Sequence, residues 1–123
     1  MPSITLKLQF VEDGIMSQKL ITEIRSAFIH VKELNLQGKD QAIFINVVYT
    51  HNDPVFPEGL FEAEIILKKK PDRTKNVLDQ LAKNVYGAIS GVLNQYEYHG
   101  FFGRVRTITF HQDEEGYVSS KSL

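Results

Sequence analysis

Hydrophobic and polar residues alternate from the first positions of the chain, which begins MPSITLKLQF. A two-residue period is typical of a β-strand with one buried face, and it predicts strands over residues 4–10, 61–68 and 104–111. Residues 42–49 form an almost continuous apolar run, which predicts another strand, buried on both faces. Two further segments repeat apolar residues at spacings of three and four, as helices on a sheet do. These positions are Leu20, Ile24, Ala27, Phe28 and Val31 in the first helix, and Leu78, Leu81, Val85, Ala88, Ile89 and Val92 in the second.

The predicted elements follow the same order twice. Strand, helix and strand occupy about residues 2–49 and again about residues 61–111. This offset of about 60 residues indicates an internal duplication. A segment rich in proline and glycine, residues 51–59, separates the two repeats, and a polar tail, residues 112–123, ends the chain. We therefore expect a single domain over residues 1–123.

The duplicated β-α-β plan predicts an α+β fold. Crossovers between parallel strands are right-handed, so two such units side by side form a four-stranded mixed sheet with both helices on one face. The other face of the sheet then has no cover within the chain. Because the apolar run over residues 42–49 cannot remain in water, we expect identical subunits to cover that face.

Composition and charge limit the partners of the chain. The 123 residues carry 14 Lys and Arg against 15 Asp and Glu, a net charge of -1, so no overall field attracts nucleic acid or a membrane. There is no cysteine, and the four histidines lack metal-ligand spacing, so we expect neither thiol chemistry nor a metal site. With no charged leader and no long apolar segment, we expect a cytoplasmic protein that loses at most Met1.

A basic cluster, KKKPDRTK at residues 68–75, is the sharpest local charge feature. Arg73 lies where the second helix is predicted to begin, next to backbone N–H groups that favour an anion. A guanidinium there can hold a carboxylate through two parallel hydrogen bonds. We expect Asp72 to cap this helix and Ser17 to cap the first one. The alternative for the cluster is a solvated strand end.

Pro2 stands directly before the first predicted strand. If Met1 is removed, Pro2 carries a free secondary amine, and an ordinary α-amino group has a pKa of roughly 8. Burial beside cations lowers such a pKa toward neutrality. The amine would then be a positioned general base, or a nucleophile that forms an iminium. The alternative is an incidental proline at a frayed chain end.

Three features together resemble the tautomerase superfamily: Met1-Pro2 before a strand, the duplicated β-α-β plan, and Arg73 at the start of the second helix. In length and layout the chain is most similar to the 5-carboxymethyl-2-hydroxymuconate isomerases. The resemblance implies a trimer with a barrel core, no cofactor, Pro2 as the catalytic base and Arg73 as the catalytic residue that binds a substrate carboxylate. Gly14 takes the equivalent place in the first repeat, which implies one such site per chain.

Other substrate-binding residues are less well defined by the sequence. Tyr49 and Phe56 are candidates for an apolar wall of the site. The second arginine of several family members has no clear counterpart, and Arg106, Arg104 and Lys39 are candidates by charge alone.

The leading hypothesis is an isomerase that interconverts enol and keto forms of a small unsaturated 2-oxo or 2-hydroxy carboxylate. Hydration or dehalogenation of an unsaturated acid uses the same proline and needs a residue that activates water, for which Asp53, Glu62 and Glu64 are available. The alternative from another class is a non-catalytic, ferredoxin-like oligomeric module that binds an acidic partner and in which Pro2 is incidental.

Overall fold

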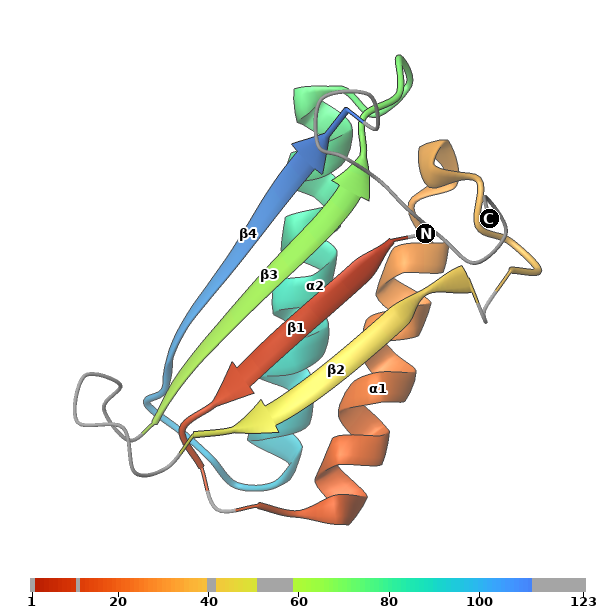
Figure 1. Ribbon diagram of the computed structural model, residues 1–123. Helices are drawn as coiled ribbons and strands as arrows, with labels where there is room; N and C mark the ends of the chain where they lie inside the picture. Colours follow the sequence, from red (N-terminus) through yellow and green to blue (C-terminus); the bar gives the residue numbers. More distant parts are fainter. Residues whose placement is uncertain (1, 11, 40–41, 51–58, 112–123) are drawn as a thin grey trace, which may run out of the picture.

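The computed structural model describes residues 2–10, 12–39, 42–50 and 59–111. These residues form four strands, two α-helices and one short 3-10 helix (Figure 1). In chain order these are β1 (Ser3–Leu8), α1 (Gly14–Ile29), η1 (Lys32–Leu34), β2 (Phe44–Tyr49), β3 (Leu60–Lys68), α2 (Lys75–Gln95) and β4 (Phe102–Phe110).

The four strands form one mixed sheet in the order β2-β1-β3-β4. β1 pairs with β2 in parallel and β3 pairs with β4 in parallel, and the two repeats join through the antiparallel pair β1 and β3. Both helices lie behind the sheet in Figure 1, so they cover the same face. The predicted fold class, a four-stranded mixed sheet of two β-α-β units with its helices on one face, is confirmed.

The core lies between this face and the helices. Ile4, Leu6 and Leu8 of β1 are at most 1% exposed, and alternate residues of β3, from Phe61 to Leu67, have no exposed surface. The apolar positions of both helices pack against them. The alternation seen in the sequence therefore marks the side of each strand that the helices cover.

β2 corrects one expectation, because it is an edge strand that is covered on one face only. Its apolar run predicted burial on both faces, yet Phe44 is 60% exposed. Ile45, Val47 and Tyr49 point toward the helices and are partly buried. The reason is that the helices of one chain cover only one side of the sheet, so Phe44 lies on the side that they leave open.

The predicted helix caps were also wrong. Asp13 caps α1, and its carboxylate accepts hydrogen bonds from the backbone N–H groups of Ile15 and Met16, both at 3.0 Å. Thr74 caps α2 and accepts from the N–H of Val77 at 3.4 Å. Ser17 lies inside the first turns of α1, since that helix begins earlier than its apolar stripe suggests.

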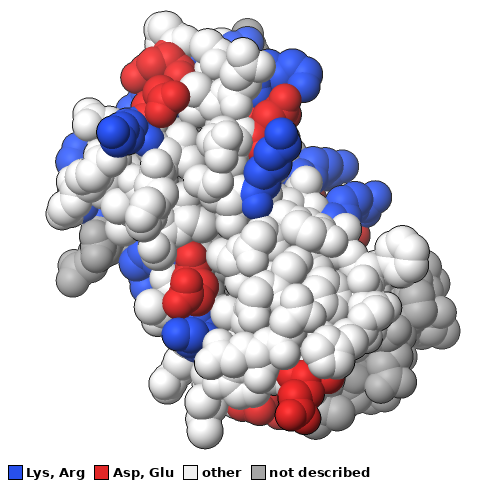
Figure 2. All heavy atoms as spheres, turned by 180° about the vertical axis from the view of Figure 1, so that it is seen from behind, with Lys and Arg blue, Asp and Glu red and all other residues white. Residues whose placement is uncertain are grey.

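The face of the sheet that the helices leave open is polar along its middle. Arg104 and Arg106 of β4 form ion pairs across the sheet with Glu62 and Glu64 of β3, at 2.8 and 2.9 Å. On the helix side, acidic and basic residues are interspersed over a broad uncharged surface (Figure 2), in keeping with the small net charge. Among the described residues, no helix has the length and apolar character needed to cross a membrane.

The contact between Gly103 of β4 and Phe61 of β3 yields a test of the packing. A Cβ added at Gly103 would overlap the ring of Phe61, which is fully buried. We expect Gly103→Ala to lower the free energy of unfolding by about 1–3 kcal/mol, because the ring cannot move without disturbing the core. Urea unfolding followed by circular dichroism measures this change.

Gly91 in α2 provides the matched control, since a Cβ there meets no atom within 4 Å. Gly91→Ala should leave stability unchanged or raise it by up to about 1 kcal/mol, the helix propensity difference. Equal stability of the Gly103 variant and the wild type would contradict the described packing.

Candidate functional site

Pro2 lies at the end of the sheet where β1 begins and β3 ends. Its residue is buried, and its carbonyl accepts a hydrogen bond from the backbone N–H of Phe44 at 3.0 Å. The register pairs Ser3 with Ile66, so Pro2 continues the strand to the level of Leu67. The proline is thus buried directly before β1, and its carbonyl is hydrogen-bonded to the start of β2.

Arg73 lies in the short connection between β3 and α2, just before the cap of that helix. Its Nη1 donates a hydrogen bond to the carbonyl of Lys68 at 2.7 Å, and the residue is only 9% exposed. Burial lowers the pKa of Arg73 from its ordinary value, and the nearby charge of Asp72 partly offsets this effect. An arginine starts from so high a pKa that it still carries its charge near neutral pH. Arg73 is therefore a fixed, largely desolvated cation.

Pro2 and Arg73 are brought to the same end of the molecule by the pairing of β1 with β3. The carbonyl that holds Arg73 belongs to Lys68, one residue along β3 from the level of Pro2. Pro2 thus lies directly before β1, and Arg73 lies in the connection that follows the neighbouring strand β3, where its guanidinium binds the carbonyl at the end of that strand.

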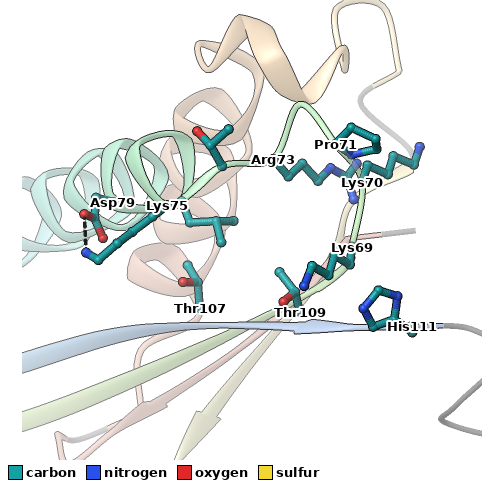
Figure 3. Close-up of a pocket in the computed structure, with 11 residues that line it drawn as sticks. Lys69, Lys70, Pro71, Arg73, Lys75, Asp79, Thr107, Thr109 and His111 are labelled. Atoms are coloured by element: carbon teal, nitrogen blue, oxygen red, sulfur yellow. Dashed lines mark hydrogen bonds and ion pairs between the residues drawn. The ribbon is translucent and has the colours of Figure 1, made fainter.

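A pocket of about 710 Å³ opens beside Arg73 (Figure 3). It lies between the β3–α2 connection with the first turns of α2 and the last part of β4. The residues that line it are Lys69, Lys70, Pro71, Arg73, Thr74, Lys75, Leu78, Asp79, Thr107, Thr109 and His111. Pro2 is not among them, so within one chain the proline does not line this pocket.

The pocket has a strong excess of positive charge. Among the described residues that line it, Asp79 is the one carboxylate, and it is paired with Lys75 at 2.9 Å. Lys69, Lys70 and Arg73 contribute charges that no lining carboxylate offsets. The N-terminus of α2 adds the positive end of the helix dipole, and its cap, Thr74, is neutral. An anion with an apolar body fits this arrangement.

The start of α1 differs in each of these respects. When the capping residues Asp13 and Thr74 are superimposed, the counterpart of Arg73 in the first repeat is Glu12, not Gly14 as the sequence suggested. The carboxylate of Asp13 already satisfies two backbone N–H groups there. Among the described residues, the start of α1 therefore carries acidic groups, Glu12 and Asp13, whereas the start of α2 presents cations.

The remaining predicted binding residues do not line this pocket within one chain. Tyr49 lies at the opposite end of the sheet, where its hydroxyl contacts Ser17 Oγ at 2.8 Å. Arg106 lies on the open face, paired with Glu64. Lys39 is exposed near the start of β2. Phe56 lies outside the described residues.

Residues at the end of β4 and lysines of the basic cluster line the pocket but were not predicted individually as site residues. Thr107, Thr109 and His111 share the helix-facing side of β4, a placement that the alternation of the last strand already indicated. Lys69 belongs to the basic cluster. The face of the sheet on which its side chain lies follows from the strand alternation at the end of β3, and the sequence did not define that end. Across the described residues, no group of three or more histidine, aspartate or glutamate side chains could hold a metal ion.

Comparison with known proteins shows similarity of fold alone. No family model matches the chain, and no curated protein matches it. A solved structure of native fused 4-OT matches with a TM-score of 0.70 at 13% sequence identity and 98% coverage of both chains. The F6 fused 4-OT, described as an asymmetric trimer, matches with a TM-score of 0.66 at 16% identity and 98% coverage of both chains. The FG41 malonate semialdehyde decarboxylase inhibited by 3-bromopropiolate matches at 0.60 and 9% identity, over 95% of this chain and 89% of the other.

These structures are tautomerase superfamily members, so the expected tautomerase-like fold is established. Identities this low show the fold and nothing finer. The similarity to 5-carboxymethyl-2-hydroxymuconate isomerases in particular stays a prediction.

The position of Tyr49 leads to a test that separates structure from binding. Its hydroxyl contacts Ser17 and donates to the carbonyl of Asp13 at 3.2 Å, so it ties β2 to the start of α1. We expect Tyr49→Phe to lower the free energy of unfolding by about 0.5–1.5 kcal/mol through these lost hydrogen bonds. Thermal and urea unfolding measure the change. Unchanged stability together with weaker ligand binding would show that Tyr49 acts in a site formed between chains instead.

Proposed function

We propose that this chain is a cofactor-independent tautomerase, an isomerase that moves a proton between the enol and keto forms of a small unsaturated 2-oxo or 2-hydroxy carboxylate. The observation that carries the proposal is the placement of buried Pro2 one residue along the β1–β3 pair from the carbonyl that holds Arg73. The tautomerase-like fold supports it.

Pro2 is the general base in this proposal. Removal of Met1 leaves a secondary amine at the start of β1, and burial near a cation favours its neutral form. The free amine takes the proton of the enol hydroxyl, the oxygen forms the carbonyl, and the electron pair of the carbon–carbon double bond takes the proton back from the ammonium at carbon. The amine is regenerated, so no other reactant is consumed.

Arg73 binds the substrate carboxylate. Its guanidinium is held by the Lys68 carbonyl and has further N–H donors available for a carboxylate. Because the cation is desolvated before the ligand arrives, its attraction for the anion is screened little by water. It also stabilises the negative charge that develops as the proton moves.

Assembly as a homotrimer is part of the proposal. It is supported by the open face of the sheet and by the exposed Phe44 and Phe102, which are 60% and 79% exposed in a single chain. The fused 4-OT of similar fold is described as a trimer. Tyr49, Phe56, Lys39 and Arg106 are proposed substrate contacts only as residues that a neighbouring subunit contributes.

The second candidate is a non-catalytic oligomeric module that binds an anion in the Arg73 pocket. The observation in its favour is that Pro2 does not line that pocket. In this case the amine has no role, and the two candidates differ in what happens when Pro2 is changed.

Pro2→Ala distinguishes the candidates. We expect this variant to lose turnover of phenylenolpyruvate, because a primary amine on a flexible residue replaces a positioned secondary amine. Absorbance of the enol follows the reaction, and the intact mass of the wild-type protein is checked first for loss of Met1. Size-exclusion chromatography shows whether the assembly is preserved. Full activity in the variant would leave the binding module as the better account.

Arg73→Met tests the carboxylate contact. We expect kcat/KM for phenylenolpyruvate to fall by the equivalent of about 2–4 kcal/mol, because a buried charged hydrogen bond to the substrate is lost. Arg73→Lys keeps the charge without the planar fork and should be intermediate. A change confined to the free energy of unfolding, with kcat/KM intact, would instead assign Arg73 a purely structural role at the start of α2.

A further inference from the structure

The connection between β3 and α2 contains a tight turn that ends at Arg73. The backbone N–H of Arg73 donates to the carbonyl of Lys70 at 3.0 Å, so residues 70–73 form a β-turn. Pro71 takes the second position of this turn, where its ring fixes the φ angle that the turn needs. In Figure 3 Pro71 and Arg73 lie on one bend of the chain, between the end of β3 and the start of α2.

The side chain of Arg73 folds back across this turn to the strand that precedes it. Its Nη1 donates to the carbonyl of Lys68 at 2.7 Å, which closes a ring through residues 69–72. The same planar peptide group is fixed on its other side, because the N–H of Lys69 donates to the carbonyl of Phe110 at 2.8 Å. The guanidinium is therefore bound to an acceptor that β4 holds in place.

The turn itself has little support from packing. Residues 70–72 are exposed, whereas Arg73 is buried. The start of α2 holds the chain beyond Arg73, since the carbonyl of Thr74 accepts from the N–H of Leu78 at 2.9 Å. Before that point, the shape of the turn depends on its own backbone hydrogen bond and on the restricted φ of Pro71.

We propose that Pro71 is a positioning residue for Arg73. By restricting the turn before a ligand arrives, Pro71 keeps the guanidinium at the Lys68 carbonyl and leaves its other N–H donors for the ligand in one arrangement. A binding group that is ordered in advance loses less conformational entropy when the ligand binds. The inference rests on the proposed function for the assignment of the substrate carboxylate to Arg73.

The first measurement uses the intact protein without a ligand. ¹⁵N relaxation gives the order parameter of the Nε–H group of Arg73. We expect about 0.8 or higher in the wild type and below about 0.6 in Pro71→Gly, since glycine frees the turn. An equally ordered Arg73 side chain in both proteins would overturn the proposal.

The second measurement is binding of 3-phenylpropanoate, a saturated carboxylate with no enol form, by isothermal titration calorimetry. We expect Kd to rise about two- to fivefold in Pro71→Ala and further in Pro71→Gly, because the substituted turn samples more conformations. His99→Gly is the matched control. His99 is exposed in the α2–β4 connection, at the opposite end of the sheet, so this variant should bind as the wild type does. Circular dichroism confirms that each variant is folded.

The Arg73→Met background separates positioning from a purely structural role. If Pro71 acts through Arg73, adding Pro71→Gly should change the remaining affinity by less than about 1.5-fold, since no guanidinium is left to position. An unchanged Kd in Pro71→Gly alone, or an equal loss in both backgrounds, would overturn the proposal.

These measurements are independent of the proline mechanism, because none of them involves proton transfer by Pro2. Failure of turnover would leave the order parameter and the ratios of Kd unchanged. Conversely, absence of binding to the wild type would contradict the carboxylate contact of the proposed function, and the order parameter would still decide whether Pro71 positions Arg73.

Discussion

β1 and β3 pair antiparallel from Ser3 opposite Ile66 to Leu8 opposite Phe61, and this pair joins the two repeats into one sheet. It is also the pair that brings the start of the chain next to the end of β3. The end of β3 leads directly into the connection that carries Arg73, whose guanidinium binds the carbonyl of Lys68. The site therefore depends on the same strand pairing as the core does.

The two repeats share a plan but differ where each helix begins. Asp13 and the hydroxyls of Ser17 and Tyr49 form a closed hydrogen-bonded group at the start of α1. At the start of α2 the cap is the neutral Thr74, and the surrounding charge is positive. Both helix starts are capped, but α1 is capped by a carboxylate and α2 by a neutral hydroxyl. The start of α2 can therefore bind an anion, whereas the start of α1 is already occupied by its own carboxylate.

Hydrophobic periodicity predicts the strands, the helices and the covered face of the sheet. It does so because a strand that lies under two helices needs an apolar residue at every second position. The same periodicity could not show that β2 is an edge strand, because an apolar run is compatible with cover from a helix or from another chain. The caps were missed because Asp13 and Thr74 precede the apolar stripes from which the helix starts were read.

Arg73 could be predicted from the sequence because the features that mark it are close together in the chain. It is a charged residue that closely follows Pro71, and a proline there favours the end of the strand. It also precedes the apolar stripe of the second helix. Thr107, Thr109 and His111 reach the same pocket from more than 30 residues away, which depends on the parallel pairing of β3 with β4. Arg106 also has the right charge, but within one chain it lies on the other face of the sheet, paired with Glu64. Charge alone does not tell which side of a strand a residue occupies.

The proposed mechanism requires that the nitrogen of Pro2 is a free amine with a lowered pKa at the start of β1. A ¹⁵N NMR titration of protein labelled at proline measures this directly. We expect a resonance that titrates with a pKa below the ordinary value of roughly 8 for an α-amino group. A Pro2 nitrogen that does not titrate, as in an amide to a retained Met1, or that titrates at or above the ordinary value, would contradict it.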